Sequence, residues 1–86
     1  MTKPTPFEID PQIVSAAVIK HTVMIAGHST SVSLEQPFWD ELNTIAKEQR
    51  MTVAELIEAI DTARQTNLSS ALRLFVLFEL KSKFDK

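Results

Sequence analysis

The spacing of hydrophobic and polar residues changes from an alternating to a helical period near residue 36. Between residues 29 and 34, Val32 and Leu34 alternate with three serines, which predicts a strand with one apolar face and one hydroxyl face. Residues 18–26 are rich in β-branched side chains and favour a second extended run. Gly27, the only glycine of the chain, then indicates a turn or bulge between the two runs.

A lone strand leaves its backbone N–H and C=O groups unpaired, so the predicted strand needs a partner. The sequence allows two. The run 18–26 can fold back on strand 29–34, or strand 29–34 can pair with the same strand of a second chain.

Three helices are expected after the strands. Over residues 36–49, apolar residues recur at helical spacing, and Pro37 suits the first turn. Thr52 followed three residues later by Glu55 has the form of a capping box, which predicts a second helix from about 53 to 65. Asn67 and Ser69 are good cap residues before a third helix from about 69 to 82.

The third helix is apolar on nearly all sides between residues 71 and 80. A helix with this pattern is buried on most sides. An 86-residue chain offers too little surface to cover it, so we infer contact with another subunit.

Residues 1–17 are interpreted as an N-terminal arm. The prolines at positions 4 and 6 favour extended backbone. Asp10 and Pro11 could begin a short helix that runs to about Ala17, whereas the β-branched residues of the same segment favour a strand. The pattern does not decide between them.

The composition is that of one small globular domain, with 44 % hydrophobic and 23 % charged residues. The absence of cysteine excludes disulfides and zinc–thiolate sites, and His21 and His28 alone are too few ligands for a metal. We therefore expect no enzyme activity, no cofactor and no metal site. Since the chain has neither a signal-peptide pattern nor an apolar run long enough to span a bilayer, we expect a cytoplasmic protein without membrane contact.

Charge is unevenly distributed along the chain. Residues 35–64 hold seven acidic and three basic side chains, whereas the whole chain has a net charge of -2. The first two predicted helices are therefore an unfavourable surface for nucleic acid.

The order of these elements resembles a ribbon-helix-helix domain of the Arc/MetJ type. The similarity is clearest in a subgroup whose two characteristic segments read here Gly27-His28-Ser29-Thr30-Ser31-Val32-Ser33-Leu34-Glu35-Gln36-Pro37-Phe38-Trp39 and Asn67-Leu68-Ser69-Ser70-Ala71-Leu72-Arg73. The resemblance covers about residues 18–80. It implies a mainly α fold with a short β-ribbon, an intertwined homodimer that could associate further into a tetramer, and an added third C-terminal helix. The domain then spans 18–86, with an extra N-terminal strand.

The resemblance also implies how the protein would bind double-stranded DNA. Two strands would form an antiparallel ribbon in the major groove, with Ser29, Ser31 and Ser33 facing the bases. The phosphate contacts would come from the start of the second helix and from nearby basic residues, namely Thr52, Val53, Arg50, His28 and Lys20. The dimer core would consist of Val32, Leu34, Phe38, Trp39, Leu42, Ile45, Leu56, Ile57, Ile60, Leu72 and Phe75.

One departure from the family pattern bears on function. Ribbon proteins commonly carry a long basic or amide side chain among the outward positions, whereas all three are serine here. Serine bonds to either base type and so discriminates poorly. Two functions follow: a DNA-binding transcriptional regulator that acts as a repressor, or an antitoxin-like dimeric module that binds a protein partner.

Overall fold

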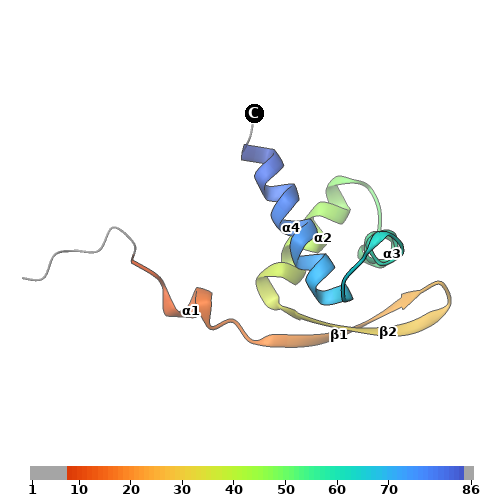
Figure 1. The fold of residues 1–86 in the computed structure, drawn as a ribbon, viewed down its shortest axis with the longest axis horizontal. Coiled ribbons are helices and arrows are strands. Elements are labelled where there is room, and N and C mark those ends of the chain that lie inside the picture. Colours follow the sequence, from red (N-terminus) through yellow and green to blue (C-terminus); the bar gives the residue numbers. More distant parts are fainter. Residues whose placement is uncertain (1–7, 85–86) are drawn as a thin grey trace, which may run out of the picture.

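The computed structural model describes residues 8–84 as a β-hairpin with three helices on one of its faces (Figure 1). This order confirms the predicted fold class of a short ribbon followed by helices, including the added C-terminal helix. The elements, in chain order, are α1 (Pro11–Val14), β1 (Val18–Ile25), β2 (His28–Glu35), α2 (Gln36–Glu48), α3 (Val53–Ala63) and α4 (Leu68–Phe84).

The strands β1 and β2 pair with each other in antiparallel orientation along their full length. Within one chain, therefore, the first of the two pairings allowed by the sequence is realised. Ala26 and Gly27 form the two-residue turn, with φ of 51° and 82°. Two consecutive positive φ values are typical of the type I′ turn, whose twist matches that of the strands it joins.

The core lies between the inner face of the hairpin and the helices. Of the residues expected in the core, seven are buried, namely Val32, Leu34, Leu42, Ile45, Leu56, Ile57 and Leu72. Phe38, Trp39, Ile60 and Phe75 are partly buried against them. The core also contains Val23, Ile25, Ala46, Ala71 and Val76.

Local hydrogen bonds explain where the helices begin and end. The capping box at the start of α3 is present, as predicted. The helix ends at Ala63, two residues earlier than expected, because Arg64 has an extended conformation. α4 starts at Leu68, where the Asn67 Oδ1 accepts a hydrogen bond from the Ser70 N–H at 2.9 Å, and continues to Phe84.

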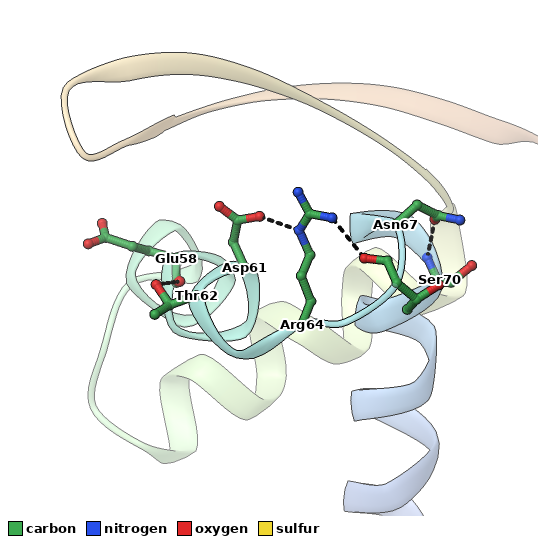
Figure 2. A network of polar contacts seen from close by, with 7 residues as sticks. Glu58, Asp61, Thr62, Arg64, Asn67 and Ser70 are labelled. Atoms are coloured by element: carbon green, nitrogen blue, oxygen red, sulfur yellow. Dashed lines mark hydrogen bonds and ion pairs between the residues drawn. The ribbon is translucent and has the colours of Figure 1, made fainter.

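The connection from α3 to α4 is held by polar contacts (Figure 2). The guanidinium of Arg64 bonds to the Asp61 carboxylate at 2.6 Å and to the Thr66 carbonyl oxygen at 2.8 Å. This second bond joins the extended segment to the end of α3. The charge of Arg64 is thus engaged by its own helix.

The segment before β1 forms a short helix rather than a strand. The Asp10 carboxylate accepts a hydrogen bond from the Gln12 N–H at 2.9 Å and so caps α1. The helix ends at Val14, before the expected end near Ala17. In Figure 1 the segment extends away from the three helices, and Ile9 and Val14 are exposed. Residues 1–7 of the predicted arm lie outside the described residues.

Among the described residues, no helix combines the length and the apolar character needed to cross a membrane.

The turn generates a first prediction. An L-residue with a side chain in the left-handed region costs about 1–2 kcal/mol, so Gly27→Ala should lower the free energy of unfolding by about that amount. A Cβ at Gly27 meets no atom within 4 Å, so the loss would come from backbone strain alone. Ala26→Asn should instead raise the free energy of unfolding by about 0.5 kcal/mol, because Asn tolerates this conformation. Urea unfolding followed by circular dichroism measures both, and a destabilised Ala26→Asn variant would contradict the turn type.

Candidate nucleic-acid interface

The outer face of the hairpin is the surface that points away from the helices. Because successive side chains of a strand point to opposite sides, burial of Val32 and Leu34 exposes the residues between them. We call the outer face the six exposed residues over the middle of this surface, namely Lys20, Thr22, Met24, Ser29, Ser31 and Ser33. The same alternation adds the pair Val18 and Glu35 at the end of the hairpin beyond them. The structure thus places the three predicted serines together on one solvent-exposed surface.

The register of the hairpin places a β1 residue opposite each serine. Lys20 lies across from Ser33, and Thr22 across from Ser31. Met24 lies across from Ser29, whose hydroxyl donates to the Met24 sulfur at 3.5 Å. Lys20 carries the only charge among the six side chains of the outer face. The serine row is therefore accompanied by a row of longer side chains.

Two of these residues, Thr22 and Met24, were not singled out from the sequence. The alternation of β1 is obscured because its outward positions include Val18 and Met24, which are as apolar as the buried Val23 and Ile25. Only the pairing with β2 decides which set points outward. The one available signal was the spacing of Lys20 and Thr22.

The end of β2 is tied to the start of α4. The Ser69 hydroxyl donates to the Ser33 carbonyl oxygen at 2.9 Å. Arg73 forms an ion pair with Glu35, with Nε 3.0 Å from Oε1. The hydrogen bond from Arg73 holds the pKa of the Glu35 carboxyl below its ordinary value. These contacts neutralise the acidic residue at the end of the strand and fix the angle between hairpin and helix.

The start of α3, predicted to contact phosphate, is already engaged in part. The Thr52 hydroxyl accepts from the Glu55 N–H at 3.1 Å, and the Thr52 N–H donates to Glu55 Oε1 at 2.8 Å. These bonds lower the pKa of the Glu55 carboxyl. The Val53 N–H stays available to another acceptor, as the first amides of a helix have no partner within it.

A known protein family has this arrangement of elements. The family described as "Ribbon-helix-helix domain" matches residues 18–80, which include the hairpin and nearly all of the three helices behind it. The chain belongs to the ribbon-helix-helix family. Domains of this family generally act as DNA-binding regulators or antitoxins, typically as dimers, and their fold is regulatory rather than enzymatic.

A solved structure is also similar to this ribbon-helix-helix chain. It is that of an uncharacterized protein from Bordetella pertussis Tohama I, with 36 % sequence identity and a TM-score of 0.61. The match covers 73 % of this chain and 55 % of that chain, so the present chain corresponds to about half of the other. No curated protein sequence matches.

The remaining predicted phosphate contacts lie in different places of the ribbon-helix-helix fold. Arg50 is exposed in the turn before α3, with φ of 58°, and is close in sequence to Thr52. His28 is exposed beside the hairpin turn, but the alternation of β2 directs it opposite to Ser29. Because α2 runs away from the hairpin, the turn between α2 and α3 lies at the end of α2 that is far from β2 (Figure 1). Arg50 belongs to this turn. Only Lys20 shares the outer face with the serines.

His21 and Trp39 pack against each other on the inner side of the hairpin. Their rings are stacked, with centroids 3.8 Å apart and an angle of 6° between the planes. The His21 Nε2 is buried and has no hydrogen-bond partner within residues 8–84. Trp39 thus takes part in the packing of its own chain. The described part of the chain contains no cluster of three or more residues able to hold a metal ion.

The capping box generates a prediction on pH dependence. Because the pKa of Glu55 is lowered by folding, its contribution to stability is present above its ordinary pKa of 4.5. The contribution is lost as the pH falls through the lowered value. Wild type should therefore exceed Glu55→Ala in free energy of unfolding at pH 7, and the difference should shrink below pH 4.5. Urea unfolding at several pH values measures it.

The matched control for this measurement is Glu58→Ala, which removes an exposed carboxylate from the same helix without touching its cap. An equal loss of stability in the two variants, or a difference from wild type that is independent of pH, would contradict the role given to Glu55.

Proposed function

We propose that this protein is a DNA-binding transcriptional regulator, most simply a repressor, that acts as a homodimer in the cytoplasm. The single observation that carries the proposal is the outer face of the hairpin. It is an exposed surface of mostly hydroxyl side chains with one cation, Lys20, and the helices lie on the opposite side. The carboxylate of Glu35, the next outward position of β2, is paired with Arg73. A two-stranded ribbon has the width that the major groove accepts.

In this proposal, β2 of each chain pairs with β2 of its partner, and the serines of both strands face the bases. A serine hydroxyl can donate to or accept from a base edge, so each serine adds affinity with little discrimination. The two-fold axis of the dimer would set two related half-sites. Sequence preference would then depend on the shape of the DNA as well as on direct contacts.

Phosphate contacts are proposed at two places. Lys20 would act beside the serines, and the Val53 N–H, with Thr52 and Arg50, would act at the start of α3. At the start of α3, the Glu55 carboxylate would weaken the binding of a phosphate, because its negative charge already accepts the hydrogen bond from the Thr52 N–H. With a net charge of -2, the protein should lose affinity steeply as salt is added.

The dimer would cover an apolar surface on α4. Leu74, Leu77 and Phe78 are 48 %, 49 % and 65 % exposed and lie on one side of the helix. Beside them, a groove of about 440 Å³ is lined mostly by apolar side chains, among them Ile60, Ala63 and Phe75, and by Arg64, Gln65 and Thr66 of the connection between α3 and α4. A second copy is the proposed occupant, because domains of this family typically form dimers.

The DNA proposal is tested with Ser31→Asp combined with Ser33→Asp. Two carboxylates on the outer face would repel the phosphates of the duplex, so binding should be lost. Fluorescence anisotropy with a duplex from the region upstream of the coding sequence measures affinity, beside a scrambled duplex. The control, Asn43→Asp with Thr44→Asp, adds the same charge on the exposed side of α2. Unchanged affinity in the serine variant would refute the assignment.

The dimer proposal is tested with Leu74→Glu combined with Phe78→Glu. A charge buried at an interface without a partner strongly opposes association, so the variant should sediment as a monomer where wild type is a dimer. Phe84→Glu serves as the control, because Phe84 is 85 % exposed near the end of the helix. A variant that remains fully dimeric would show that α4 lies outside the interface.

A second candidate function is an antitoxin-like module that binds a protein partner. The exposed apolar side of α4 favours it. However, α4 also contributes Leu72 and Val76, 0 % and 2 % exposed, to the core of its own chain. Removal of residues 66–86 should therefore unfold the domain rather than release a separate docking segment. A stoichiometric partner protein co-purified from the native host would support the second candidate.

A further inference from the structure

We infer that two chains form one four-stranded sheet toward DNA, in the order β1, β2, β2 of the partner, β1 of the partner. In this sheet Lys20 contacts phosphates at the edges of the groove. This inference rests on the proposed function, because it assigns the roles of the two strands within that DNA-binding surface. It starts from the hairpin, which gives each chain two strands instead of one.

The edge of β2 that faces away from β1 carries backbone groups that do not bond to β1. In an antiparallel pair, backbone groups alternately face the partner strand and face away from it. In a hairpin closed by a two-residue turn, the backbone N–H and C=O groups of the flanking pair, Ile25 and His28, point toward the opposite strand. The N–H and C=O groups of Ser29, Ser31 and Ser33 therefore face away from β1. The bond from Ser69 to the Ser33 carbonyl agrees with this direction.

That bond also locates the seam between two chains. Because Ser69 already occupies the Ser33 carbonyl, the unengaged stretch of the edge is centred on Ser29 and Ser31. Two such edges complement each other when Ser29 pairs with the partner's Ser31 and Ser31 with the partner's Ser29. This register places the two-fold axis at Thr30.

The width of the resulting sheet assigns the strands to different parts of DNA. Neighbouring strands are about 4.8 Å apart, so the two outer strands would stand about 14 Å apart, beyond a groove about 12 Å wide. Only the central β2 pair fits within the groove, so the sheet would bend toward the DNA at its centre and the β1 strands would lie along the two phosphate backbones. The serines then meet bases, and Lys20 meets phosphate.

The side chains agree with these positions. Serines on the central strands let the backbone approach the base edges closely, since they are short. Lys20, on an outer strand, reaches past the sheet with a flexible charged side chain that suits a phosphate. The neighbouring strand β1 therefore supplies the long side chain that the serines lack. Lys20 would add affinity for DNA without recognising particular bases.

The strand order can be tested without DNA, because the chain contains no cysteine. A disulfide requires Cα atoms within about 7 Å. Thr30→Cys should form a disulfide-linked dimer on mild oxidation, since facing residues at the axis lie about 4.5 Å apart. Thr22→Cys, on β1, should not. A linked Thr22→Cys dimer would make β1 the seam, and no linkage at Thr30 in a protein that sediments as a dimer would place the seam elsewhere; either result overturns the inference.

The role of Lys20 is tested by salt titration with a 30-base-pair duplex selected from a randomised pool and a scrambled duplex. Lys20→Met should weaken binding to both duplexes by the same factor. It should also reduce the slope of log affinity against log salt by about 1.8 per dimer, from two lost phosphate contacts. Lys20→Arg should restore both. Lys83→Met, at the far end of α4, removes an equal charge and should change neither.

A loss confined to the selected duplex would mean that Lys20 reads bases and that a single hairpin enters the groove, which overturns the inference. An unchanged slope would overturn it as well. If wild type binds neither duplex, the proposed function fails, and the cysteine experiment still decides the strand order independently.

Discussion

The two-residue period of a paired strand governs both faces of the hairpin. Because Val32 and Leu34 must be buried beneath the helices, Ser31 and Ser33 must face solvent. A shift of one residue would bury hydroxyl groups without partners and expose the apolar pair, at a cost of several kcal/mol. The hydrophobic core thus also determines which side chains the hairpin exposes.

The helix α4 fixes the position of the hairpin relative to the core. It buries Leu72 and Val76 in the core, and its first turns bond to Ser33 and Glu35 at the end of β2. The same helix leaves Leu74, Leu77 and Phe78 exposed on its other side. One element therefore fixes the hairpin within its own chain and leaves an apolar surface exposed.

Much of the architecture was predictable because its signals are local. The alternation of 29–34, the box formed by Thr52 and Glu55, and the cap at Asn67 each involve residues within a few positions of one another. Errors were confined to ends, as at Ala63, where the extended conformation of Arg64 stops α3. The capping box and a phosphate contact were both predicted at Thr52, and the box engages the Thr52 N–H and hydroxyl with Glu55.

The order of the elements, the face of β2 that carries the serines and the excess apolar surface of α4 could all be read from the chain before folding was considered. These follow from periodicity, which is a property of neighbouring residues. The pairing of β1 with β2 in the register that sets Lys20 beside Ser33, and the engagement of the β2 edge by Ser69, became visible only in three dimensions. Pairing between strands joins residues whose match is decided by the burial of a whole face and by a turn with two positive φ values, so no local pattern contains it.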